Sequence, residues 1–163
     1  MNCLMCGEEM ETHTGNVRYE ALPGAILKGV RINECPNCGE REIEIPRIAE
    51  LNRVLAKVLI CQAARLTGPE IRFLRKHLGL AGCDFADRMG VSASTVSRWE
   101  AGKQKIGPSN DRLLRMMVAY EEPVEDYTDQ LANVAREEPK QDRPEVNIRE
   151  KDHHWQPDRA VRA

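Results

Sequence analysis

Residues 85–102 have the sequence Phe85-Ala86-Asp87-Arg88-Met89-Gly90-Val91-Ser92-Ala93-Ser94-Thr95-Val96-Ser97-Arg98-Trp99-Glu100-Ala101-Gly102, and they decide the fold of the second half of the chain. Gly90 breaks a first helix, because glycine adopts the left-handed conformation that ends helices. Ser92 is a favourable N-cap for a second helix over residues 93–101, and Gly102 ends it. The stretch therefore predicts two short helices joined by a tight turn.

The second of these helices carries a candidate DNA-binding face. Val96 and Trp99 lie three positions apart, so both should face the core. The opposite face presents small polar groups and Arg98, whose guanidinium suits bidentate contact with guanine or phosphate. The helix N-terminus at Ser92 suits a backbone phosphate. With two lysines of the following loop, the candidate DNA-binding residues are Ser92, Ala93, Ser94, Ser97, Arg98, Lys103 and Lys105.

The residues on either side continue the helical pattern. Apolar side chains recur every three or four positions over residues 71–80 and 113–118. Together with the central stretch they predict an all-α domain of five helices over residues 67–120. Residues 46–66 have the same period, with Pro46 near the first turn, and predict a connecting helix.

Charge is distributed unevenly along the chain. The net charge of −2 combines −4 over residues 1–45, +7 over residues 46–120 and −5 over residues 121–163. A basic middle between acidic ends indicates that one segment faces a polyanion. Because this segment contains the candidate DNA-binding helix, the expected polyanion is double-stranded DNA.

Two matched cysteine pairs lie in the first 39 residues, Cys3-Leu4-Met5-Cys6-Gly7 and Cys35-Pro36-Asn37-Cys38-Gly39. Two C-x-x-C pairs supply four soft ligands, which suits a tetrahedral Zn²⁺. A site closed by four sulfurs leaves no position for water or substrate. The pairs therefore predict one structural Zn²⁺ and a reducing, cytoplasmic location. The predicted ligands are Cys3, Cys6, Cys35 and Cys38.

Other interpretations of the cysteine pairs remain open. Rubredoxin-like iron uses the same knuckles, although Tyr19 is the only aromatic residue nearby. A redox dithiol fits less well, because two matched pairs are present. His13 lies between the pairs, but four cysteines already fill a tetrahedral shell. Cys61 and Cys83 have no C-x-x-C partner and are predicted to be packing residues.

Residues 1–45 are predicted to form a small β-rich module around the metal. Strands are expected over residues 17–22, 25–32 and 41–45, with a turn at Pro23-Gly24. So short a segment buries little surface, so the metal should supply folding energy. Near the cysteines, Glu8, Glu9 and Glu11 form either an acidic docking patch or solvated surface.

Residues 121–163 are acidic and contain four prolines, which predicts a largely disordered tail with one short helix over residues 126–136. The pair His153-His154 could bind metal, but a disordered tail is the favoured interpretation. His77 is expected at the surface or as a partner of a helix dipole. The predicted fold class is α+β in two domains, a β-rich zinc module followed by an all-α domain.

The run Gly90–Gly102 resembles the helix-turn-helix of phage repressors, known as the Cro/C1 or XRE family. The resemblance implies that the helix after Ser92 is the recognition helix, and that Arg75 and Glu100 form a buried ion pair. Gly82 stands where that family often has a glutamine that contacts phosphate.

With the cysteine pairs ahead of this domain, residues 1–120 resemble the MqsA/YgiT type of bacterial antitoxin. The resemblance implies that the zinc module neutralises a ribonuclease toxin. It also implies that the XRE domain forms a homodimer and represses its own operon at a palindromic operator. The family's recognition arginine matches Arg98, whereas its asparagine is replaced by Ser94.

The sequence contains no catalytic constellation, which predicts that the protein is not an enzyme. It also lacks an apolar stretch long enough for a membrane span. The alternative to an antitoxin is a solitary zinc-stabilised XRE-family transcriptional regulator with no toxin partner. The product of the neighbouring gene separates the two hypotheses.

Overall fold

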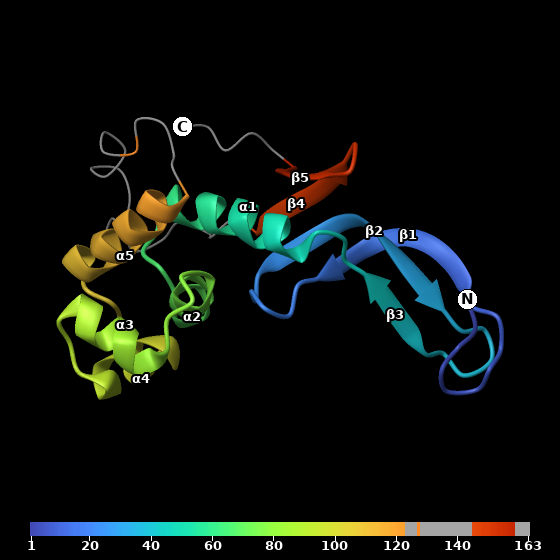
Figure 1. Ribbon diagram of the computed structural model, residues 1–163, viewed down its shortest axis with the longest axis horizontal. Helices are drawn as coiled ribbons and strands as arrows, with labels where there is room; N and C mark the ends of the chain where they lie inside the picture. Colours follow the sequence, from blue (N-terminus) through green and yellow to red (C-terminus); the bar gives the residue numbers. More distant parts are fainter. Residues whose placement is uncertain (123–126, 128–144, 159–163) are drawn as a thin grey trace.

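The computed structural model describes residues 1–122, 127 and 145–158, which form a mixed α+β fold (Figure 1). The described residues contain a five-stranded sheet and five α-helices. The helix expected over residues 126–136 falls outside them, apart from Tyr127. The mixed α+β class is therefore confirmed.

The sheet begins with an antiparallel hairpin of β1 (Glu11–Arg18) and β2 (Ala25–Glu34). The strand expected over residues 17–22 is misplaced, because residues 19–24 form the turn of this hairpin. Tyr19 donates its backbone N–H to the Ala25 carbonyl at 2.9 Å, and Leu22 donates to Tyr19 at 3.1 Å. Both side chains are buried, so their apolar character reflects a packed turn and not a strand.

On the edge away from β1, β2 pairs with two further strands, each over a different part of its length. β3 (Arg41–Glu44) is antiparallel to the end of β2, from Arg31 to Glu34, whereas β4 (Val146–Lys151) is parallel to its start, from Ala25 to Lys28. β5 (His154–Pro157) then pairs with β4 in a hairpin. The prediction of a disordered tail is therefore wrong for residues 146–157. The segment is polar on average, but it contains three buried apolar side chains, Val146, Ile148 and Trp155.

Five helices follow the N-terminal strands along the chain: α1 (Ile48–Ile60), α2 (Gly68–His77), α3 (Gly82–Met89), α4 (Ala93–Glu100) and α5 (Pro108–Glu121). Residues 67–120 thus contain four helices and not the expected five. α1, the expected connector, contacts α2 and α5 on one side and β4 and β5 on the other (Figure 1). One continuous cluster of buried side chains accordingly runs from the sheet through α1 into the later helices.

A buried ion pair, absent from the sequence-based predictions, connects α1 and α5. Arg115 and Asp111 are fully buried on α5, and Arg115 Nε lies 2.5 Å from Asp111 Oδ1. The other carboxylate oxygen accepts the backbone N–H of Leu66 at 2.7 Å. The two terminal nitrogens of Arg115 donate to the carbonyls of Leu59 and Ile60 at the end of α1 and to those of Gln62 and Ala64 just after it.

This arrangement supplies hydrogen bonds that a helix end needs. The last carbonyls of a helix have no partner within it, and burying them unpaired is costly. The hydroxyl of Tyr127 also donates to the Ile60 carbonyl, at 2.8 Å. In the sequence, this contact is indicated by the oppositely charged Asp111 and Arg115, which lie four positions apart among apolar residues.

Candidate functional site

The two cysteine pairs form matching turns at the end of the sheet. Cys3 donates its backbone N–H to the Glu8 carbonyl at 2.8 Å, and Cys35 donates to Glu40 at 2.9 Å. Each turn closes with a glycine N–H that donates to the first cysteine's carbonyl, and these glycines have φ of 76° and 73°. A side chain at such positive φ would be strained, so glycine allows both turns to close.

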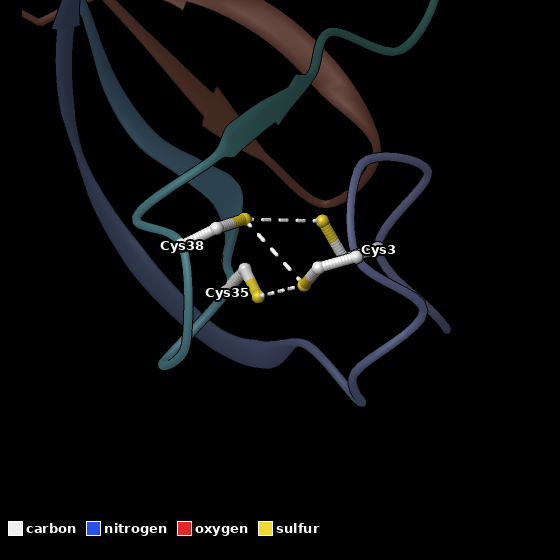
Figure 2. Close-up of side chains that lie close together, drawn as sticks. Cys3, Cys35 and Cys38 are labelled. Atoms are coloured by element: carbon white, nitrogen blue, oxygen red, sulfur yellow. Dashed lines mark hydrogen bonds between the residues drawn. The ribbon is translucent and has the colours of Figure 1, made fainter.

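These turns bring all four sulfurs together (Figure 2). The Sγ atoms of Cys3 and Cys38 are 3.5 Å apart, and Cys6 lies 3.4 Å from Cys35 and 3.6 Å from Cys38. All four ligand atoms lie within 4.8 Å of one another. A tetrahedron with Zn–S bonds of about 2.3 Å has sulfur–sulfur edges of about 3.8 Å. The cluster therefore fits one structural Zn²⁺, and the predicted zinc site is confirmed.

The backbone around the sulfurs favours thiolates. The backbone hydrogen bond from Glu8, followed by contacts with Asn37 and Cys35, lowers the pKa of Cys6 to about 6. At Cys38 the backbone hydrogen bond from Glu40 also acts to lower the pKa, but contacts with neighbouring thiols and burial raise it to about 12. Four thiolates this close need a cation, so zinc binding releases protons.

The remaining sequence candidates lie away from the metal cluster. His13 is exposed on β1 and is not among the clustered ligands. Cys61 packs partly buried against the core, and its burial raises the pKa of the thiol. Cys83 is exposed on α3, so its prediction as a packing residue is wrong. His77 lies 3.7 Å from Glu122, and burial lowers its pKa.

The candidate DNA-binding residues lie on helix α4, at its N-cap and in the loop that follows it. Ser92 caps the helix by accepting the backbone N–H of Thr95 at 3.2 Å. Val96 and Trp99 are buried beneath it. The Arg98 guanidinium lies along its own helix, within 3.3 Å of the Ser94 carbonyl oxygen. All of the predicted residues are exposed, namely Ser92, Ala93, Ser94, Ser97, Arg98, Lys103 and Lys105.

The opposite end of α4 is held firmly against α2. Arg75 Nε lies 2.5 Å from Glu100 Oε1, which is the ion pair that the family resemblance implies. Arg72 reaches the other carboxylate oxygen at 3.1 Å. Although burial acts to raise it, these two arginines lower the pKa of Glu100. A Cβ added at Gly68 would lie 2.5 Å from the Glu100 carbonyl oxygen, so α2 approaches α4 at a position that only glycine permits.

The fold and the site together define a class of protein, one in which a Cys₄ zinc centre on a small sheet precedes a set of short helices. The family model described as the antitoxin component of a bacterial toxin–antitoxin system, MqsA, matches residues 1–127. The chain therefore belongs to this antitoxin family. A search of curated proteins finds no match. β4 and β5 lie beyond the residues that the family model matches.

The four cysteines of the metal cluster lie within the residues that the family model matches. Among the residues that the structure describes, no helix is both long and apolar enough to cross a membrane.

Proposed function

We propose that this antitoxin neutralises a ribonuclease toxin and represses its own operon by binding a palindromic operator as a homodimer in the cytoplasm. The observation that carries the proposal is the family match over residues 1–127, which spans the zinc centre and helices α1 to α5. The protein acts by binding, and zinc has a structural role in it.

Operator binding is assigned to the α4 surface. A helix capped by Ser92 directs its first backbone N–H groups outward, where a phosphate can accept them. Arg98 is exposed, and its contacts with its own helix are long, 3.3 and 3.4 Å, so its guanidinium can turn toward a base or phosphate. Lys103 and Lys105 add positive charge in the next loop. The Arg75–Glu100 pair fixes the helix that carries these groups.

We expect Arg98→Ala to weaken operator binding by about 1–3 kcal/mol, because it removes one bidentate or phosphate contact from each recognition helix. Fluorescence anisotropy with the DNA upstream of the protein's own gene, at one fixed salt concentration, measures the change. Arg53→Ala is the matched control, because Arg53 is an exposed arginine on α1. Equal affinities for the Arg98→Ala protein and the wild type would remove Arg98 from the interface.

Toxin binding is assigned to the metal-bearing end of the sheet. Leu4 and Met5 protrude between the first two cysteines with 89% and 74% of their surface exposed. Glu8, Glu9 and Glu11 are exposed beside them. Apolar side chains bordered by carboxylates suit a basic partner with an apolar pocket.

Co-expression with the product of the adjacent gene tests the antitoxin role. We expect the antitoxin to restore growth that the toxin inhibits and to copurify with it. A matched variant, Leu4→Glu with Met5→Glu, should lose the complex while retaining one zinc per chain. An adjacent gene product that neither inhibits growth nor binds would favour the solitary regulator instead.

A further inference from the structure

Strands β4 and β5 close an edge of the sheet that the first 127 residues leave open. β1 covers one edge of β2, and β3 covers only the half of the other edge from Arg31 to Glu34. β4 pairs with the remaining half, from Ala25 to Lys28. An open half-edge would present unpaired backbone groups beside a buried core. The C-terminal hairpin thus occupies a docking position for one extended strand.

The same hairpin also holds the start of α1. Trp155 is 4% exposed, and its Nε1 donates to the Pro46 carbonyl at 2.8 Å. His154 Nδ1 lies 3.0 Å from Glu50 Oε1 on the first turn of α1. Arg47, at the N-cap of α1, has a left-handed backbone with φ of 45° and no side-chain cap. The hairpin therefore contacts a strained junction that the helix itself leaves uncapped.

A third set of contacts fixes the far end of the hairpin to the sheet. Lys28 Nζ on β2 lies 2.5 Å from Asp158 Oδ2, and Arg149 lies 2.8 Å from the other oxygen. The Asp158 carboxylate is only 13% exposed, so these charges are partly shielded from solvent. The Asp158 backbone N–H also donates to the Asn147 carbonyl at 2.8 Å. Residues 145–158 are thus held to β2 and to α1 by backbone, apolar and ionic contacts.

We propose that residues 145–158 form a strap that holds the metal-bearing sheet and α1 in one fixed orientation. Apart from the covalent connection through Arg47, the turn of the β1–β2 hairpin reaches α1 through buried apolar side chains and one hydrogen bond, from the Tyr19 hydroxyl to Asn52 Oδ1 at 2.9 Å. The larger contacts of the sheet with α1 are those of β5 and β4. The strap contacts both sides of this junction. This role of the strap is separate from the antitoxin function. The same contacts would hold the sheet against α1 even if the protein had another function.

The test compares two full-length, zinc-loaded variants of neighbouring residues on β5. Trp155→Ala removes the buried contact with α1, whereas Gln156→Ala removes an exposed side chain. In the wild type and in Gln156→Ala, ¹⁵N relaxation should give one rotational correlation time for sheet and helices. In Trp155→Ala, we expect the sheet amides to tumble faster than those of α2–α5. Amides of β4 should also lose protection against hydrogen exchange.

A milder variant covers the case in which Trp155→Ala disrupts folding. Trp155→Phe retains a smaller aromatic ring but loses the hydrogen bond to the Pro46 carbonyl. Hydrogen exchange of β4 should then increase about fivefold, which corresponds to one ordinary hydrogen bond. One zinc per chain and unchanged helical circular dichroism show that the fold is intact. The proposal is overturned if a folded Trp155→Ala protein keeps one correlation time, or if exchange of β4 is the same in Trp155→Phe and the wild type.

Discussion

Replacing Arg115 with methionine is expected to lower the free energy of unfolding by about 3–5 kcal/mol, because it leaves the buried Asp111 carboxylate without its countercharge. The Ile60, Gln62 and Ala64 carbonyls also lose the hydrogen bonds that Arg115 donates. Methionine is shorter than arginine but similar in volume, so the loss is mainly electrostatic. Urea unfolding followed by circular dichroism measures it.

Two comparisons isolate the cause. Arg88→Met changes an exposed arginine on α3 and should alter stability by less than about 0.5 kcal/mol. In the double variant Asp111→Leu with Arg115→Met, the unpaired charge is gone as well. We expect it to be more stable than Arg115→Met alone. A loss below about 1 kcal/mol for Arg115→Met would show that the ion pair stabilises the fold little.

Removing zinc is expected to unfold the metal-bearing turns while the helices persist. The cysteine turns contribute only a small separate cluster of buried residues, Cys3, Met10 and Cys35, so little apolar surface holds them. Structural zinc contributes about 10–16 kcal/mol of binding free energy in isolated zinc-finger peptides. That is an upper bound here, because the sheet packs on α1. Chelation or Cys35→Ser should therefore abolish ordered signals from residues 1–10 and 35–40.

The measurements are metal content by mass spectrometry and amide chemical shifts with and without chelator. Cys83→Ser is the matched control, because Cys83 is a free cysteine outside the cluster. It should retain one zinc per chain. Zinc affinity should fall as pH falls, because protons compete with the metal for thiolates such as Cys38, whose pKa without metal is about 12. Full zinc retention by Cys35→Ser would contradict the four-cysteine site.

The parts of the structure that were predicted correctly are those with local sequence signals. C-x-x-C-G is a complete turn with its two ligands, so spacing alone identified the metal cluster. Ser92 begins α4 and Gly90 ends α3, so each signal lies next to the helix that it predicts. Buried Val96 and Trp99 likewise followed from helical period.

The parts that were missed depend on residues far apart in the chain. Val146 and Ile148 alternate with polar residues, and nothing nearby indicates that their partner is β2. Tyr19 and Leu22 have strand-like character but are buried in a turn. The role of Arg115 requires the end of α1, which reaches it only in the folded protein.

The parallel pairing of β2 with β4 also has a consequence for the time order of synthesis. β2 leaves the ribosome early, whereas β4 follows only after α1 to α5. Pairings between such distant segments form slowly, since the loop between them must first close. Until then the nascent chain exposes a bare strand edge, which is the kind of surface on which chaperones act and aggregation begins. The nascent chain is therefore more exposed to aggregation and proteolysis before β4 pairs with β2 than after.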